Sequence, residues 1–390
     1  MNKPEYDFIL FEHLYNVENH YKDLNNLAML LKDAGYKVAI ANAFKEKDLC
    51  DINGITHIQV DIKCPEEFKH ISKNIKVRSC WRNWYYKFKK DIYLYKILKE
   101  LKQKSHNIYI GSLTYAMPVL FLMLLDKKTR YYMWALRSYT LSKWKESIFC
   151  IYSIMSWIYY YYIRNNKNIS LFVSNEIIKD EINKIGIEKE RLILRPERFI
   201  EKINVKDIPN ERSKELKLLY IGTLRSSKNV ELCVEAIKQL NAIDVKYIIA
   251  GRCKSDNKYN DYIKDITNGI PNIIRIDKYL TEEEYKKLIE ECDFLVLCDK
   301  KEKSCATYGT MTEALLQGKP IIAPNIEPFS SEIQRYEIGR LYNYNDAVSL
   351  CKTISSLRTI DYSSIYKNIK DYQRLFLKSR IVEELKKQIC

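Results

Sequence analysis

The sequence alternates short apolar segments typical of β-strands with longer segments of helical periodicity, and this alternation limits the possible folds most strongly. In the amino-terminal half, the apolar run Phe8–Phe11 is followed by the helical pattern Asp23–Lys32, which Gly35 ends. Further strands are expected at Lys37–Ile40, Ile58–Val60, Ile108–Ile110, Tyr131–Trp134 and Ser170–Val173. Strands separated by helices predict a mostly parallel, doubly wound sheet.

A second cycle of the same alternation begins after the polar stretch Glu201–Ser213, which we interpret as a linker. Its expected strands are Leu216–Ile221, Val245–Ala250, Asn272–Ile276, Phe294–Leu297 and Pro320–Ala323. We therefore predict an α/β protein with two Rossmann-like domains, 1–205 and 206–361. Tyr362–Gln388 has the pattern of one amphipathic helix, so 362–390 is expected as a carboxyl-terminal helix, with a return to the first domain as one option. Ligands of such folds bind at the carboxyl ends of the strands.

Composition and missing motifs narrow the function classes. The formal charge of +15 indicates an anionic partner, such as nucleotide phosphates or acidic lipids, but no nucleic-acid-binding motif is present. The eleven cysteines are scattered without metal-ligand spacing, which favours reduced thiols. No Asp-x-Asp, GxGxxG, GxxxxGK[ST] or GxSxG motif occurs, which argues against a metal-diphosphate clamp, a dinucleotide dehydrogenase, a P-loop ATPase and an α/β-hydrolase. The polar Met1–Tyr6 does not resemble a signal peptide, so we expect a cytoplasmic protein.

One uncharged segment, Ser147–Ile163, is rich in aromatic residues and has basic residues on both flanks. It is shorter than the roughly 20 apolar residues of a typical membrane span. A buried core helix, an interfacial patch and a true span all remain open. The basic, aromatic stretch Arg78–Leu101 is expected to be helical and partly exposed, and it adds to the case for contact with an anionic membrane surface.

The strongest chemical signal is the segment LLYIGTLRSSKNV, Leu218–Val230. A strand ends at Gly222, and Arg225 and Lys228 lie in the following loop, just before an expected helix Val230–Leu240. Two cations beside helix amides can bind a diphosphate leaving group and neutralise its charge. The alternative is two solvated surface cations. On the first interpretation, replacing either cation by alanine should weaken nucleoside-diphosphate binding and leave the fold intact.

A second candidate segment, SCATYGTMTEALLQGKP (Ser304–Pro320), follows a later strand. Gly309 and Thr310 are expected to offer backbone N–H donors at a helix start. Glu313 is one turn further along and can accept hydrogen bonds from ribose hydroxyls, although a solvated glutamate is the simpler alternative.

Together these segments resemble the nucleotide-sugar domain of family 4 glycosyltransferases (group 1), which are retaining enzymes of the GT-B fold. The resemblance covers about Lys217 to Leu350 and rests on the order of its motifs, ending in Gly318-Lys319-Pro320. It implies that Arg225 and Lys228 bind the donor diphosphate, with Gly222, Tyr308, Gly309 and Thr310 around the donor. It also implies that Glu313 binds the ribose as the second acid of the Glu-x7-Glu pattern.

The chain departs from this family at Cys305, where the first glutamate of that pattern is usual, and Tyr308-Gly309 is displaced by one residue from the usual Phe-Gly. In the amino-terminal half, His13 follows the first strand and Arg137 follows Tyr131–Trp134. We expect these two residues to contact the acceptor or to take part in catalysis; the alternative for each is a structural role.

The sequence thus predicts a hexosyltransferase that uses a UDP- or GDP-sugar and a glycan or lipid-linked acceptor, with no cofactor and no metal. Cell-surface polysaccharide biosynthesis and a peripheral location at the inner face of the plasma membrane are implied by the resemblance and the aromatic segment. The alternative is a non-catalytic GT-B scaffold that serves as a binding module.

Overall fold

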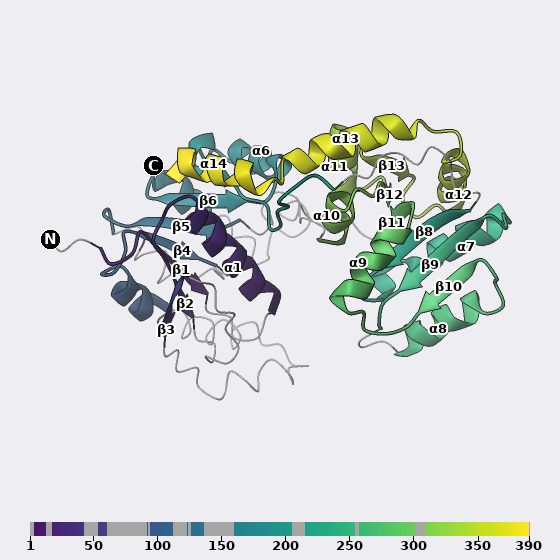
Figure 1. Ribbon diagram of the computed structural model, residues 1–390, viewed down its shortest axis with the longest axis horizontal. Coiled ribbons are helices and arrows are strands. Elements are labelled where there is room, and N and C mark those ends of the chain that lie inside the picture. The colour runs from purple at the N-terminus through teal and green to yellow at the C-terminus, as the bar shows by residue number, and fades with distance from the viewer. Residues whose placement is uncertain are drawn as a thin grey trace. The chain divides into compact units, whose positions relative to one another are not determined.

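The computed structural model describes residues 4–12, 18–42, 54–60, 92, 94–111, 123, 126–135, 160–204, 215–253, 257–300 and 309–389. The chain divides into two compact units, each a sheet flanked by helices (Figure 1). The first comprises Met1–Phe199 and Lys378–Cys390, and the second comprises Ile200–Leu377. These boundaries lie a few residues from the expected linker, and they place only the last thirteen residues, rather than all of 362–390, apart from the second unit.

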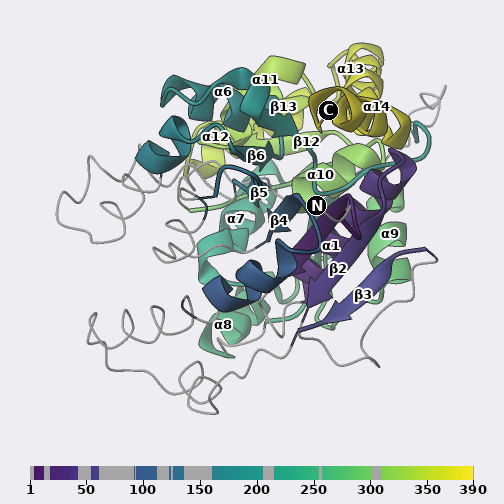
Figure 2. The ribbon, with the colours of Figure 1, turned by 90° about the vertical axis from the view of Figure 1, so that its left-hand side faces the viewer.

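The first unit contains a seven-stranded sheet of order β3-β2-β1-β4-β5-β6-β7, and all of its pairings are parallel. Its strands are β1 Phe8–Glu12, β2 Val38–Asn42, β3 Thr56–Gln59, β4 Asn107–Ile110, β5 Arg130–Trp134, β6 Ile169–Val173 and β7 Leu192–Leu194. Figure 2 shows β2 and β3 side by side at one end of this sheet. The helices of this unit include α1 Glu18–Asp33, α6 Glu176–Lys184 and α14 Lys378–Ile389, with a 3-10 turn η2 at Lys189–Arg191.

One face of this sheet packs against α1 and α14 in a single apolar cluster. Leu27 and Leu31 of α1 and Ile381 and Leu385 of α14 are buried in it, together with Phe8 of β1. The carboxyl-terminal helix therefore belongs to the core of the first unit, because its apolar stripe covers strands formed by the start of the chain.

A buried ion pair fixes the beginning of α1 to the far edge of the same sheet. Arg195 follows β7 and is fully buried, and its guanidinium donates to both carboxylate oxygens of Asp23 on α1 at 2.6 and 2.9 Å. The same guanidinium lies 4.6 Å from the centre of the Trp134 ring. A planar guanidinium suits this combination of bidentate pairing and ring stacking, which lysine cannot reproduce.

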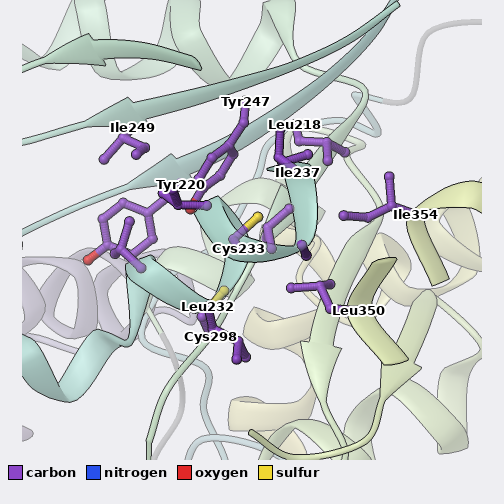
Figure 3. Packing of buried hydrophobic residues seen from close by; sticks show 14 of the residues in the cluster. Leu218, Tyr220, Leu232, Cys233, Ile237, Tyr247, Ile249, Cys298, Leu350 and Ile354 are labelled. Atoms are coloured by element: carbon purple, nitrogen blue, oxygen red, sulfur yellow. The ribbon is translucent and has the colours of Figure 1, made fainter. Parts of the chain in front are cut away.

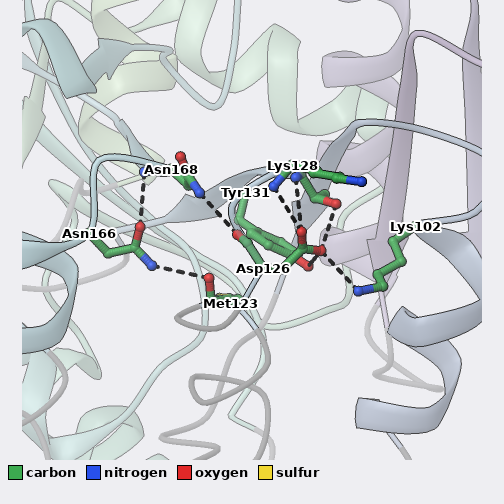
Figure 4. Close-up of polar contacts among 8 residues, drawn as sticks. Lys102, Met123, Asp126, Lys128, Tyr131, Asn166 and Asn168 are labelled. Atoms are coloured by element: carbon green, nitrogen blue, oxygen red, sulfur yellow. Dashed lines mark hydrogen bonds and ion pairs between the residues drawn. The ribbon is translucent and has the colours of Figure 1, made fainter.

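A second polar cluster precedes β5 (Figure 4). Asp126 accepts hydrogen bonds from the backbone amides of Lys128 and Thr129, from the Thr129 hydroxyl and from the Tyr131 hydroxyl, and it forms an ion pair with Lys102 at 3.2 Å. Burial opposes ionisation, but these hydrogen bonds outweigh it and lower the pKa of Asp126 to about 2. The carboxylate therefore stays charged and holds the turn that leads into β5.

The second unit contains a six-stranded parallel sheet of order β10-β9-β8-β11-β12-β13. Its strands are β8 Leu216–Ile221, β9 Val245–Ala250, β10 Ile273–Ile276, β11 Phe294–Val296, β12 Ile321–Pro324 and β13 Gly339–Tyr342. Its helices are α7 Val230–Leu240, α8 Asn257–Thr267, α9 Glu282–Glu291, α10 Gly309–Leu316, α11 Phe329–Tyr336, α12 Ala347–Ser356 and α13 Tyr362–Arg374, with a 3-10 turn η3 at Ser226–Lys228.

The side chains of this sheet alternate between two separate cores. Leu218 and Tyr220 of β8 face α7, α8 and α12, with Cys233 and Cys298 in the same cluster (Figure 3). Leu219 and Ile221 of β8 face the other side, which α9, α10, α11 and α13 cover. The unit is thus a three-layer structure whose central strand is buried on both faces, as the continuous apolar run of that strand predicts.

The pattern Tyr362–Gln388 is two helices, α13 and α14, and not the single helix expected. The break lies at Leu375–Leu377, where Phe376 is buried and its carbonyl accepts a hydrogen bond from the Ile200 amide. Leu377 also forms an isolated parallel bridge with Ile200. The apolar stripe continued across the break because both helices bury one face, but in different units.

The two aromatic segments are described only in part. Residues 94–101 of the basic stretch are helical and include the buried Leu94, Leu98 and Leu101. Of Ser147–Ile163, only residues 160–163 are described; there Ile163 is buried and Tyr161 is exposed. Within the described ranges, every helix is too short or too polar to cross a bilayer.

Candidate functional site

The strand order of the second unit reverses between β8 and β11. From β8 the chain continues through β9 to β10 on one side, and then returns to β11 on the other side of β8. In open parallel sheets, the crevice for ligands opens at the carboxyl ends of the two strands that flank such a reversal. The described residues of the two loops concerned are 222–229 and 297–300.

Two glycines allow the backbone segments that follow β8 and β9 to lie close together at this edge. Gly222 follows β8 with φ 134° and Gly251 follows β9 with φ 135°, a region that side-chain-bearing residues avoid. A Cβ atom on Gly251 would lie 2.0 Å from the Gly222 carbonyl oxygen. The predicted site residue Gly222 therefore has a demonstrable structural role, which is to let the chain turn away at the end of the central strand.

The loop after β8 places Arg225 and Lys228 around a short 3-10 turn. Arg225 is the extended residue that precedes η3 and is exposed. Asn229, in the left-handed conformation with φ 50°, separates η3 from α7, and its side-chain amide donates to Asn345 at 3.2 Å. The helix therefore starts after an intervening turn, and the two cations differ in surroundings.

Lys228 forms an ion pair with Asp299, whose Oδ1 lies 3.2 Å from the lysine Nζ. Asp299 is the third residue after the end of β11 and its side chain is 2% exposed, whereas the Lys228 side chain is 21% exposed. Next to it, Lys300 donates from its backbone amide to the Ser227 carbonyl at 3.0 Å and from its Nζ to Glu231 of α7 at 2.6 Å. The two loops at the strand reversal are thus connected by one ion pair and a backbone hydrogen bond, and a second ion pair connects the loop after β11 to α7.

Sequence reasoning missed Asp299 as part of this site. Its signal was its position two residues after the expected strand Phe294–Leu297, in the loop that follows a strand, which is the criterion that selected Arg225 and Lys228. Tyr220 and Tyr342 flank it, and burial first and then the Asp299 charge raise the pKa of Tyr220. Both tyrosine hydroxyls donate elsewhere, Tyr220 to the Thr223 carbonyl and Tyr342 to the Leu297 carbonyl, each at 3.0 Å.

The second candidate segment forms α10, whose first two residues are Gly309 and Thr310. Amides in the first turn of a helix have no acceptor within the helix, so these residues can donate to an anionic ligand. Glu313 is half-buried and accepts a hydrogen bond from Gln317 at 3.3 Å, so it is not the fully solvated glutamate of the simpler alternative. Lys319 caps α9 instead, donating to the carbonyls of Glu290 and Cys292 at 2.7 Å each.

Four residues singled out from the sequence, His13, Arg137, Cys305 and Tyr308, lie outside the described residues. Their predicted roles remain predictions. Among the residues that the structure does describe, no group of three or more His, Cys, Asp or Glu side chains is arranged to hold a metal ion.

The sequence led us to expect that alanine at either cation leaves the fold intact, and the Lys228–Asp299 pair changes this expectation for Lys228. Lys228→Ala leaves the Asp299 carboxylate buried without this partner, so we expect it to lower the free energy of unfolding by about 2–4 kcal/mol. Arg225→Ala removes an exposed side chain, so its effect should stay within about 0.5 kcal/mol. Chemical denaturation of both variants checks this; equal stabilities would show that Asp299 does not need Lys228.

One family model matches the chain, and its match lies entirely in the second unit. Residues 201–375 match the model for glycosyl transferases group 1, a range that contains both loops and α10. No curated protein matches the chain in sequence.

Solved structures resemble the chain over nearly its whole length. A glycosyltransferase from Rickettsia africae ESF-5 has a TM-score of 0.63 at 13% identity and covers 97% of this chain and 98% of its own. Anabaena Alr3699/HepE in complex with UDP has a TM-score of 0.65 at 10% identity, with 98% and 99% covered. WaaG, a glycosyltransferase involved in lipopolysaccharide biosynthesis, has a TM-score of 0.61 at 14% identity, with 96% and 98% covered. The chain therefore has the GT-B fold of these structures, and its second unit is similar to glycosyl transferases group 1.

Proposed function

We propose that the chain is a glycosyltransferase that moves a hexose-type sugar from a UDP- or GDP-sugar to a glycan or lipid-linked acceptor. The observation that carries this proposal is the pair of linked loops at the strand reversal of a unit similar to glycosyl transferases group 1, where Arg225 and Lys228 lie. A cationic site at that position suits the diphosphate of an activated sugar.

In the proposed reaction, the bond from the sugar to the diphosphate breaks and negative charge grows on the departing phosphate. Arg225 and Lys228 would stabilise that charge, and the amides of Gly309 and Thr310 would donate to the donor's phosphates or sugar. Glu313 would bind the ribose hydroxyls. Since these groups supply cations and fixed dipoles, the proposed mechanism needs no metal, and positioning and leaving-group stabilisation provide the catalysis. Retention of configuration belongs to this proposal through the family resemblance.

The setting we propose is cell-surface polysaccharide biosynthesis at the inner, cytoplasmic face of the plasma membrane. Two structural relatives support the choice of donor and process: HepE in complex with UDP, and WaaG in lipopolysaccharide biosynthesis. The net charge of +15 suits a protein that meets both an anionic donor and an anionic lipid surface.

The second candidate function is a non-catalytic binding scaffold, which Cys305 favours because the first glutamate of the family pattern is replaced. Slow hydrolysis of a nucleotide-sugar separates the two, because an active transferase usually hydrolyses its correct donor. A scaffold would bind a nucleotide, if at all, without turnover.

Donor binding provides the direct test of the site. Arg225→Ala should weaken binding of UDP or GDP by about 1.5–3 kcal/mol, the range for hydrogen bonds to charged groups. Glu313→Gln should weaken nucleotide binding, because it removes the carboxylate proposed to bind the ribose. It should lower the free energy of unfolding by less than about 0.5 kcal/mol. Titration calorimetry measures both. Arg340→Ala on β13 and Glu235→Gln on α7 are matched controls at exposed positions. Wild-type affinity in both test variants would remove these residues from the site.

Metal removal tests the proposed clamp. If the cations neutralise the diphosphate, sugar transfer or donor hydrolysis should continue at an undiminished rate in excess EDTA. Loss of activity that manganese restores would instead show that a metal ion neutralises the diphosphate.

Membrane docking is tested by co-sedimentation with vesicles of anionic and of neutral lipid. Basic clusters contribute roughly 1 kcal/mol per Lys or Arg near an anionic surface, so binding should require anionic lipid and be reversed by salt. Resistance to alkaline carbonate would indicate a true span. No binding at low salt would contradict docking and leave Ser147–Ile163 as a core helix.

A further inference from the structure

The proposed diphosphate site contains a buried carboxylate in direct contact with one of its two cations. Asp299 lies 3.2 Å from the Lys228 Nζ, and it is nearly inaccessible to solvent while the lysine is partly exposed. A carboxylate at this position repels the phosphates that the site is proposed to attract. Its presence therefore calls for a physical reason.

We infer that Asp299 is a built-in counter-anion that competes with the diphosphate for Lys228 and so limits how tightly the site retains nucleoside diphosphates. The inference rests on the proposed function, because it concerns the same loops. Asp299 is in this view an affinity-determining residue, and it makes departure of the diphosphate product easier.

The surroundings of Asp299 support this competition. The two flanking tyrosines, Tyr220 and Tyr342, each have one hydroxyl hydrogen, and both donate it to backbone carbonyls. Neither hydroxyl can take the place of Lys228 as donor to Asp299 without leaving its carbonyl. If Lys228 turned fully towards a diphosphate, the Asp299 carboxylate would lose this ion-pair partner, which costs free energy at a buried charge.

Lys228 can serve both anions at once. Its ammonium group has three N–H donors, so one can remain on Asp299 while others reach a phosphate. Lys300, the cation next to Asp299 in the chain, cannot simply replace Lys228, because Lys300 is itself paired with Glu231 at 2.6 Å. Lys228 then neutralises the Asp299 charge only in part. The remaining negative charge near the bound diphosphate weakens binding without abolishing it.

A purely supporting role for Asp299 predicts the opposite effect of its removal. If the carboxylate only held Lys228 in place, its replacement would let the lysine move and would weaken the binding of phosphates. The sign of the change in affinity thus separates the two roles.

The test uses Asp299→Asn, whose amide oxygen can still accept a hydrogen bond from Lys228 while the charge is removed. The control is Glu215→Gln, which removes one negative charge from the same unit at an ion pair with Lys246 of 2.7 Å. Glu215 directly precedes β8, so it lies at the amino ends of the strands, away from the site. Titration calorimetry on the full chain would use inorganic pyrophosphate, UDP, GDP, uridine and guanosine as probes.

We expect Asp299→Asn to bind pyrophosphate and whichever nucleoside diphosphate the wild type prefers about tenfold more tightly. Affinity for the corresponding nucleoside, which has no phosphate, should not change, and Glu215→Gln should match the wild type throughout. In the double variant Lys228→Gln/Asp299→Asn, the gain should disappear, because the cation released by Asp299 is then absent.

Unchanged or weaker binding of pyrophosphate by folded Asp299→Asn would overturn the inference. Asp299→Ser removes the same charge with a smaller side chain, so it gives the same test if the asparagine variant unfolds at a lower temperature than the wild type. Failure of the proposed function has a different signature: the wild type and Asp299→Asn would bind pyrophosphate with the expected difference, but neither would prefer a nucleoside diphosphate over pyrophosphate.

Discussion

The ion pair between Lys228 and Asp299 joins the two loops on which the proposed chemistry depends. One loop follows β8 and the other follows β11, the two strands between which the sheet order reverses. Because Asp299 is buried, the pair also fixes a cation at the edge of the sheet where a ligand is expected. The local fold of the second unit and its proposed anion site therefore share one interaction, and neither can be altered without affecting the other.

Much of the fold was predictable from the sequence, because continuous apolar runs and helical stripes are local signals. The bounds of β8, β9 and α7 match those expected. The edge strands β7 and β13 were missed, since they are only three and four residues long and do not form an extended apolar pattern. The break between α13 and α14 was also missed: an apolar stripe shows that a helix buries a face, but it does not show against which unit.

The candidate site could be inferred from the sequence only where its residues lie close together in the chain. Arg225 and Lys228 belong to one loop, so their spacing after a strand was visible. Asp299 is 71 positions from Lys228, and only the parallel pairing of β8 with β11 brings the two together. The close approach of Gly222 and Gly251 likewise depends on the register of β8 and β9. Such contacts arise from tertiary structure, and no local pattern in the sequence predicts them.

This shared interaction also shapes what substitutions can reveal about the site. Arg225 is exposed, so a loss of affinity on its replacement can be assigned to the ligand with little correction for folding. Lys228 is different, because it balances a buried charge and is also proposed to contact the diphosphate, so its removal mixes unfolding with binding. Replacing Asp299 separates the two effects: it removes the buried charge that needs balancing and leaves the cation in place.

A leaving-group site of this kind has to hold the diphosphate strongly enough to stabilise bond breaking, yet release it afterwards. A neighbouring carboxylate that competes for the same lysine lowers the affinity for the product without removing the cation that acts in the transition state.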